Sequence, residues 1–186
     1  MSAAAGRGMR RRRGLVAMFA LTLPGLGSAR PGASLVAPNV VAIHDRLVTS
    51  GQPHAGALST LGTLGFEAVV YLAPSSVADA VAAEPALLER QGITFVHIPI
   101  PFDRPEPAHF RALAAALDRL RARRVLVHCQ VNLRASTLVF LYRAIVLKED
   151  PAVAYEAVAR VWSPQGPWRS LASTLLREHG IAFELY

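Results

Sequence analysis

The sequence is poor in the residues that mark several common classes of protein. It has a single cysteine, Cys129, so no disulfide can form within the chain. This thiol is either buried and inert or free to do chemistry. The six histidines lack the spacing of a zinc site, and there is no glycine-rich loop for a nucleotide. We therefore predict no bound metal and no cofactor.

The distribution of charge and of aromatic residues argues against nucleic-acid binding. The formal net charge is +7, but five of the 20 basic residues lie in residues 1–29, which contain no acid. The other 15 basic residues stand against 13 acidic ones, so the rest of the chain is nearly balanced. No basic stretch is interleaved with the aromatic side chains that stack on bases. The positive charge therefore belongs to the N-terminal segment.

That segment has the pattern of a secretory signal. A run of arginines is followed by an apolar stretch over residues 15–26 and then by small residues up to Ala29. The apolar stretch is shorter than the roughly 20 residues of a membrane-spanning helix, and Pro24 interrupts it. We predict that residues 1–29 are a signal peptide and that the protein is exported to the periplasm or another extracytoplasmic space. The alternative is an uncleaved N-terminal anchor, with no other membrane contact.

The remainder is predicted to be one domain, residues 40–186, after a linker over residues 30–39 that is rich in proline, glycine and serine. Hydrophobic residues make up 52% of the chain and charged residues 18%, which is typical of a packed globular protein. Apolar strands alternate with helical patterns. This predicts an α/β fold with a mostly parallel central sheet flanked by helices, with more helices gathered at the C-terminal end. The predicted strands cover residues 47–51, 67–73, 94–100 and 124–129, and residues 76–91 are predicted to form an amphipathic helix.

The segment "RVLVHCQVNLRAS", residues 124–136, is the strongest candidate for a functional site. Cys129 ends the most apolar strand, at the edge of a parallel sheet where ligands bind, and a helix is predicted from about residue 132. Backbone N–H groups of such a turn can converge on one anion, and the helix dipole favours the same negative charge. Arg134 adds a planar set of donors for phosphate or sulfate. These effects favour a thiolate at Cys129, which would be the nucleophile.

We call residues 129–134 the cysteine loop. Ser136 could donate a hydrogen bond to the sulfur, and His128 is expected to brace the loop. The opposite interpretation also stands at this stage: a lone cysteine at the end of a strand is often a small buried hydrophobe, and an arginine in a first helical turn often faces solvent. The predicted anion-binding residues are Gln130, Val131, Asn132, Leu133, Arg134 and Ser136.

Three segments, "HCQVNLRAS", "TSGQP" at residues 49–53 and "HIPIPFDRPEP" at residues 97–107, resemble a bacterial phosphatase-like family related to the beta-lactamase-hydrolase-like proteins. That family is similar to the dual-specificity protein phosphatases. The resemblance covers roughly residues 40–161. It implies a cysteine-dependent phosphatase fold, with Cys129 as nucleophile and Arg134 as phosphate clamp. The implied substrate is a phosphorylated protein or a small phosphoester, and no pattern indicates an oligomeric state.

Hydrolysis through a cysteinyl-phosphate also needs an acid that protonates the leaving oxygen. The loop that contains "PFDRPEP" follows a predicted strand, so its acids lie at the carboxyl edge of the sheet. Asp103 is the first candidate and Glu106 the second. Gln52, in the TSGQP segment, is expected to shape a turn or to line the pocket.

One feature departs from ordinary protein phosphatases, which have five residues between the cysteine and the arginine, whereas this chain has four. Rhodanese-like sulfurtransferases use four, usually with glycine where Asn132 stands. Asparagine is the next-best residue for a left-handed backbone. Two alternatives to a phosphatase therefore remain: a rhodanese-like sulfurtransferase and a catalytically silent module that binds an anion or a phosphopeptide.

Overall fold

The computed structural model describes Met1, Ser2 and residues 34–186. The predicted signal peptide therefore lies almost entirely outside the described residues, as does the first part of the predicted linker. The strands are β1 (Val41–His44), β2 (Leu47–Ser50), β3 (Ala68–Tyr71), β4 (Thr94–His97) and β5 (Val125–His128). The helices are α1 (Ala55–Leu58), the 3-10 helix η1 (Leu61–Leu64), α2 (Glu84–Glu89), α3 (Pro107–Leu120), α4 (Leu133–Leu141), the π-helix η2 (Tyr142–Val146), α5 (Pro151–Ala159) and α6 (Gly166–Glu178).

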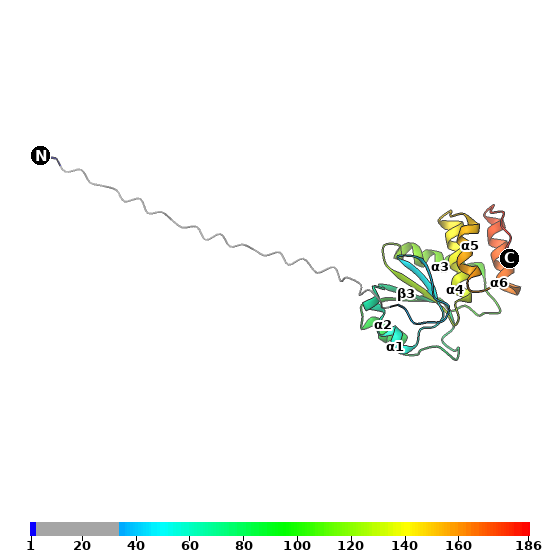
Figure 1. Ribbon diagram of the computed structural model, residues 1–186, viewed down its shortest axis with the longest axis horizontal. Coiled ribbons are helices and arrows are strands. Elements are labelled where there is room, and N and C mark those ends of the chain that lie inside the picture. Colours follow the sequence, from blue (N-terminus) through cyan, green and yellow to red (C-terminus); the bar gives the residue numbers. More distant parts are fainter. Residues whose placement is uncertain (3–33) are drawn as a thin grey trace.

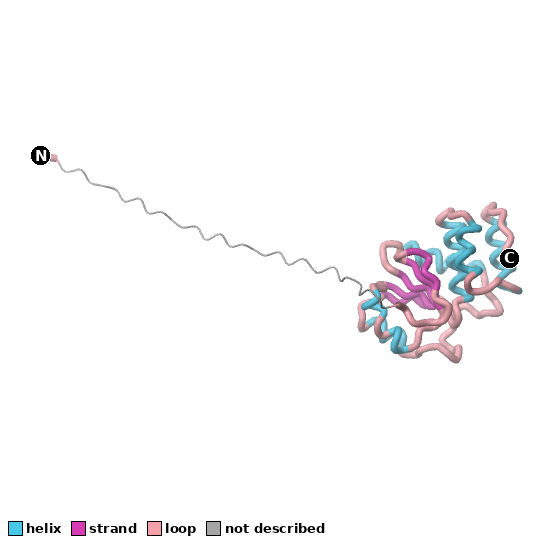
Figure 2. Tube along the Cα trace, in the orientation of Figure 1, coloured by secondary structure: helices cyan, strands magenta, loops and turns pink. Residues whose placement is uncertain are grey.

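The five strands form one sheet in the order β1-β2-β5-β3-β4. β2, β5, β3 and β4 are parallel, and β1 pairs antiparallel with β2 at one edge. Figure 1 and Figure 2 show this sheet with α1 and α2 on one side and α3 to α6 on the other. The predicted mostly parallel sheet flanked by helices, with helices gathered at the C-terminal end, is confirmed.

The sheet is covered on both faces at its centre, where every residue of β2, β5 and β3 is buried. Val69 and Leu126 pack with residues of α1 and α2 into one core cluster. Val70 and Val127, which point to the opposite face, pack with α3 to α6 in a larger cluster. β5 lies in the middle of the sheet, between β2 and β3, and all four of its residues are buried. The residue that follows β5 is Cys129.

The prediction of a helix over residues 76–91 is wrong for most of that segment. Only Glu84–Glu89 is helical, and the segment before it forms turns. Pro85 lies in the first turn of α2, where its missing N–H costs nothing. If the helix began further upstream, the proline ring would clash with the preceding turn. Residues 72–83 therefore form an irregular segment that runs from the end of β3 to α2.

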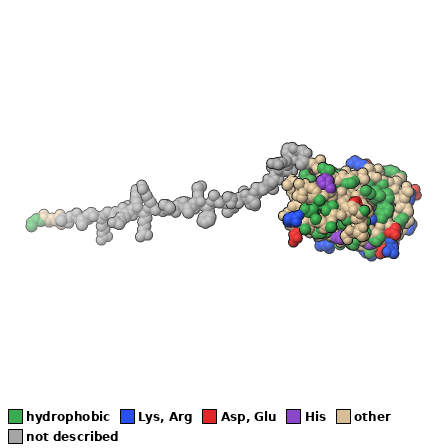
Figure 3. Space-filling view, turned by 90° about the horizontal axis from the view of Figure 1, so that it is seen from below, with side chains coloured by type: hydrophobic (Ala, Val, Ile, Leu, Met, Phe, Trp, Pro, Cys, Tyr) green, Lys and Arg blue, Asp and Glu red, His purple; other side chains and the backbone are tan. Residues whose placement is uncertain are grey.

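The surface agrees with the near balance of charge outside residues 1–29. On the face drawn in Figure 3, basic and acidic side chains both occur around the edge. Within the part of the chain that the structure describes, no helix combines the length and the apolar composition that a membrane crossing requires.

Candidate active site

The cysteine loop joins the carboxyl end of β5 to α4. At the start of the loop, Cys129 N–H donates to the carbonyl of Ser50 at 3.3 Å. At its end, Ser136 N–H donates to the carbonyl of Asn132 at 2.9 Å, which is the first hydrogen bond of α4. Asn132 has φ 71°, a left-handed conformation with which asparagine is compatible. Its buried side chain donates to the carbonyl of Asn39 at 2.6 Å and to Thr49 Oγ1 at 3.0 Å. Contacts outside the loop thus hold the strained residue in place.

The TSGQP segment packs directly against the loop. Gln52 N–H donates to the carbonyl of Gln130 at 2.9 Å, and Gly51 forms an isolated bridge with Val131. A Cβ atom on Gly51 would lie 2.6 Å from the Gln130 carbonyl oxygen and 3.0 Å from Val131 Cα. Both contacts are with backbone, which cannot swing aside. Glycine is required here because the two segments approach so closely.

Replacing Gly51 with alanine is expected to destabilise the fold by about 1–3 kcal/mol, because the added methyl group must displace backbone of the cysteine loop. Urea denaturation measures this change. Gly62→Ala is the matched control, since a Cβ atom there meets only the Gln91 side chain, at 3.4 Å and beyond. Equal stability of the two variants would contradict the close approach described above.

The described end of the predicted linker, residues 34–39, also contacts this region. The carbonyl of Pro38 accepts from Gly51 N–H at 2.7 Å, and Asn39 Nδ2 donates to the carbonyl of Val131 at 3.0 Å. These residues therefore help to fix the outer side of the cysteine loop.

Cys129 lies at the floor of the loop and is fully buried, within the larger core cluster. Ser136, predicted to reach the sulfur, is buried as well, and its hydroxyl donates to the carbonyl of Leu133 at 3.2 Å. Val131 is the most outward member of the loop, with 44% of its surface exposed.

Arg134 is turned inward rather than toward solvent, with only 4% of its surface exposed. Its Nε donates to the carbonyl of Ile100 at 3.0 Å, and its Nη1 donates to Gln130 Oε1 at 3.3 Å. Its Cζ lies 5.0 Å from the centre of the Phe102 ring, a cation–π contact. The guanidinium therefore connects the cysteine loop to the proline-rich loop (residues 98–106).

The proline-rich loop brings the two candidate acids to the same edge of the sheet, in different roles. Asp103 is exposed, next to Phe102, whose carbonyl accepts from Trp168 Nε1 at 2.8 Å. Glu106 is the N-cap of α3, where its carboxylate accepts from the backbone of His109 in a capping box. Glu106 is thus occupied in starting a helix, whereas the side chain of Asp103 makes no hydrogen bond within residues 34–186.

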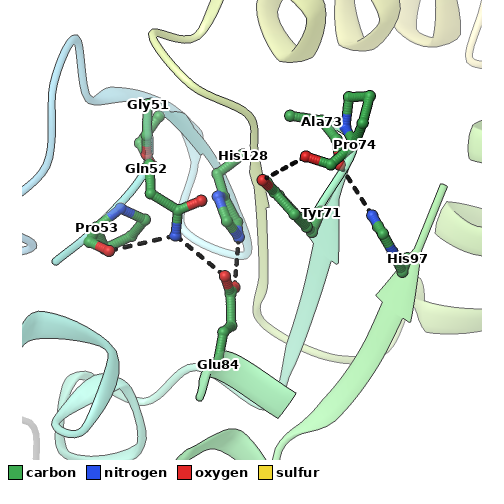
Figure 4. Close-up of polar contacts among 10 residues, drawn as sticks. Gly51, Gln52, Pro53, Tyr71, Ala73, Pro74, Glu84, His97 and His128 are labelled. Atoms are coloured by element: carbon green, nitrogen blue, oxygen red, sulfur yellow. Dashed lines mark hydrogen bonds and ion pairs between the residues drawn. The ribbon is translucent and has the colours of Figure 1, made fainter. Parts of the chain in front are cut away.

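Behind the loop lies a buried polar cluster, drawn in Figure 4. His128 Nε2 is 2.7 Å from Glu84 Oε1, and Gln52 Nε2 donates to Glu84 Oε2 at 3.0 Å. All three side chains are buried, with exposed fractions of 0% for His128, 2% for Glu84 and 7% for Gln52. His128, predicted to brace the loop, and Gln52, predicted to shape a turn, both contact the carboxylate of Glu84. Glu84 was not among the residues predicted for the site.

Tyr71 stands beside this cluster, between two histidines. Its ring stacks on His128 at 4.8 Å and on His97 at 5.0 Å, because β3 lies between β5 and β4. Burial, followed by the nearby carboxylates of Glu84 and Asp79, raises the pKa of Tyr71 to about 12. Tyr71 therefore stays neutral at physiological pH.

Asp79 is the second acid that the sequence reasoning missed. It belongs to the segment between β3 and α2, and its Oδ1 accepts from Gln130 Nε2 at 3.0 Å. The Gln130 carboxamide thus bridges Asp79 and Arg134 across the mouth of the cysteine loop.

No family model matches the chain, and no curated protein matches it in sequence. Solved structures do match. A candidate phosphatase (DUF442) from Shewanella putrefaciens CN-32 is 27% identical, with a TM-score of 0.71, over 77% of this chain and 92% of that one. TpbA from P. aeruginosa is 21% identical, with a TM-score of 0.58, over 81% and 92%. The PP-IP phosphatase SIW14 from S. cerevisiae is 18% identical, with a TM-score of 0.60, over 78% and 88%. This is the fold of the protein-tyrosine and dual-specificity phosphatases.

In this phosphatase fold, the cysteine loop gathers most of the residues predicted for the site. Cys129 and Arg134 share one loop, and Gln130 contacts the arginine. His128 and Gln52 lie behind the loop, and Asp103 lies on the proline-rich loop that Arg134 contacts. Among the described residues, no group of three or more His, Cys, Asp or Glu side chains is placed to hold a metal ion.

Proposed function

We propose that the chain is a cysteine-dependent phosphatase that hydrolyses phosphomonoesters. The observation that carries this proposal is the inward position of Arg134, whose guanidinium lies over a loop that begins at Cys129. Among residues 34–186 no carboxylate forms an ion pair with this buried guanidinium, which suits it to an incoming oxyanion. The 27% identity to the candidate phosphatase from Shewanella putrefaciens supports the same activity.

In the structure Nη1 of Arg134 donates to Gln130 Oε1, and Cys129 is fully buried. Phosphoryl oxygens accept hydrogen bonds as Oε1 of Gln130 does, but they carry negative charge, which strengthens their hydrogen bonds to arginine. In the proposed reaction the phosphoryl group therefore displaces Gln130 and settles between the guanidinium, the loop amides and the sulfur. The amino end of α4 stabilises the same charge.

The chemistry takes two steps. The Cys129 thiolate attacks phosphorus, so that an S–P bond forms while the ester P–O bond breaks, and Asp103 gives its proton to the leaving oxygen. Water then attacks the cysteinyl-phosphate and loses a proton to the Asp103 carboxylate. The S–P bond breaks, the thiolate is restored, and inorganic phosphate leaves.

The proposed substrate is a phosphorylated protein or a small phosphoester. A cysteine-to-serine variant of TpbA was crystallised with pTyr, and SIW14 is a PP-IP phosphatase, so proteins with this fold bind or act on phosphorylated compounds of different kinds. We also propose that the chain is related to the phosphatase-like family of the beta-lactamase-hydrolase-like proteins. Residues 1–29 are proposed to direct export to the periplasm.

Steady-state hydrolysis of p-nitrophenyl phosphate tests the proposed function. The spacing of four residues between Cys129 and Arg134 favours a second candidate, a sulfurtransferase, so the same preparation is assayed for sulfur transfer from thiosulfate to cyanide. Ester hydrolysis without sulfur transfer supports the phosphatase. Sulfur transfer without ester hydrolysis overturns it.

Asp103→Asn is expected to lower kcat for p-nitrophenyl phosphate by about 10²-fold, because the amide cannot donate a proton to the leaving oxygen. The alkaline limb of the pH–rate profile, where the wild type loses this proton, should disappear. Glu106→Gln is the matched control from the same loop. It should keep kcat and lose no more than about 1 kcal/mol of stability, since it only weakens a helix cap. If the pH–rate profile of Asp103→Asn matched that of the wild type, another group would be the acid.

A further inference from the structure

The proposed reaction depends on where the Asp103 carboxyl points, and this direction is set by a turn in the proline-rich loop. Arg104 N–H donates to the carbonyl of Pro101 at 3.2 Å, so residues 101–104 form a turn with Phe102 and Asp103 at its centre. The carbonyl of Phe102 belongs to the peptide that joins these two central residues. Rotation of this peptide would change the backbone angles of Asp103 and redirect its side chain.

The central peptide of this turn is held from α6. Trp168 Nε1 donates to the carbonyl of Phe102 at 2.8 Å, although the two residues are 66 positions apart. Trp168 is fully buried, so its indole N–H, which can only donate, needs an acceptor within the protein. The Phe102 carbonyl is that acceptor. The hydrogen bond therefore fixes the orientation of the peptide that leads into Asp103.

The ring of Phe102 is contacted by three side chains, one of which is again Trp168. The ring centres of Phe102 and Trp168 are 5.8 Å apart, and that of Trp162 lies 6.1 Å from Phe102. Arg134 Cζ lies 5.0 Å from the same ring, so the turn stands beside the guanidinium of the proposed phosphate site. Phe102 still has 40% of its surface exposed, so burial of the ring alone does not fix the turn.

The two tryptophans of the chain contact this turn in different ways. Trp162 packs near the Phe102 ring, but its Nε1 donates to Thr137 Oγ1 on α4 at 3.2 Å. Trp162 therefore touches the turn without holding its central peptide. Trp168 does both.

The carboxyl of Asp103 has no anchor of its own in the described part of the chain. It is exposed, and it makes no hydrogen bond within residues 34–186. A general acid must come within hydrogen-bond reach of the leaving oxygen, and a displacement of about 1 Å can cost about 10²-fold in rate. The direction of this side chain therefore depends on the backbone that carries it.

We propose that Trp168 is a positioning residue for the acid of the reaction: by holding the peptide between Phe102 and Asp103, its indole N–H directs the Asp103 carboxyl toward the cysteine loop. This inference rests on the proposed function, because it concerns the proton that Asp103 gives to the leaving oxygen. It assigns a role to a residue of α6, outside the two loops that carry the nucleophile and the acid.

The test varies how much the substrate needs an acid. Phenolate is a poorer leaving group than p-nitrophenolate, so cleavage of phenyl phosphate depends more strongly on protonation by Asp103. kcat/KM is measured for phenyl phosphate and p-nitrophenyl phosphate with the wild type, Trp168→Phe and the matched control Trp162→Phe. Phenylalanine keeps an aromatic ring and removes the N–H donor. An unfolded fraction lowers both kcat/KM values by the same factor, so their ratio reports on the acid however well a variant folds.

For Trp168→Phe, kcat/KM should fall by about tenfold for phenyl phosphate and by about threefold for p-nitrophenyl phosphate, because a misdirected acid matters more for the poorer leaving group. The inhibition constant of inorganic phosphate should stay at the wild-type value. Trp162→Phe should keep the wild-type ratio of the two kcat/KM values. Adding Trp168→Phe to Asp103→Asn should leave the ratio of that variant unchanged, because Trp168 acts through Asp103.

A wild-type ratio in Trp168→Phe, or an equal change of the ratio in Trp162→Phe, would overturn the positioning role and leave the phosphatase proposal intact. A change that persists when Trp168→Phe is added to Asp103→Asn would also overturn it, since the indole would then act through another group. A wild type that hydrolyses neither ester would overturn the proposed function and the positioning role together.

Discussion

Cys129→Ser is expected to lower kcat for p-nitrophenyl phosphate by at least about three orders of magnitude, roughly 4 kcal/mol of transition-state stabilisation. A serine hydroxyl is a poorer nucleophile than a cysteine sulfur, and the proposed reaction includes no general base that would activate it. The substitution changes one atom, so binding of the phosphoryl group should survive.

Steady-state kinetics measures the loss, and the inhibition constant for inorganic phosphate measures the retained binding. Thermal denaturation is the control: a hydroxyl at a fully buried position costs about 1–2 kcal/mol at most, which leaves the protein folded during the assay. A variant that keeps wild-type kcat would exclude Cys129 as the nucleophile.

Arg134→Lys is expected to lower kcat/KM by about 10²–10³-fold. Lysine keeps the positive charge but loses the planar set of donors that can bind two phosphoryl oxygens together. Lysine also loses the hydrogen bond to the Ile100 carbonyl and the contact with the Phe102 ring. Residue 134 then no longer connects the cysteine loop, which carries the nucleophile, to the proline-rich loop, which carries the acid. The variant should also lose about 1–3 kcal/mol of stability.

Arg143→Lys is the matched control that separates catalysis from stability. Arg143 is similarly buried, with 9% of its surface exposed, but its guanidinium binds Glu149 and the carbonyl of Ala154. Its replacement should cost a comparable amount of stability and leave kcat/KM unchanged. A similar loss of kcat/KM in both variants would mean that Arg134 has only a structural role.

The sequence was enough to predict the four parallel strands and the position of the cysteine loop, because the relevant signals are local, but the antiparallel edge strand β1 was not predicted. The apolar run that forms β5 and the helical pattern after it meet at Cys129, and the parallel arrangement places that point at the ligand-binding edge. Asn132 is left-handed, a conformation for which asparagine is the next-best residue after glycine.

What the sequence could not supply was the set of contacts between distant segments. Glu84 and His128 are 44 residues apart, and Glu84 lies in a stretch where a longer helix was predicted. The available signal was Pro85, which marks a helix start and so places Glu84 in the first turn. The inward turn of Arg134 depends on the Ile100 carbonyl and the Phe102 ring, which only the packed fold brings near.

The most direct test of the account is to stop the reaction with acid during turnover of p-nitrophenyl phosphate and to map the phosphorylated residue by mass spectrometry. Attack by Cys129 predicts one phosphoryl group on the peptide that contains Cys129, and more of it in Asp103→Asn, whose second step lacks its base. Active enzyme that carries no phosphoryl group on that peptide, or carries it on another residue, would contradict attack by Cys129.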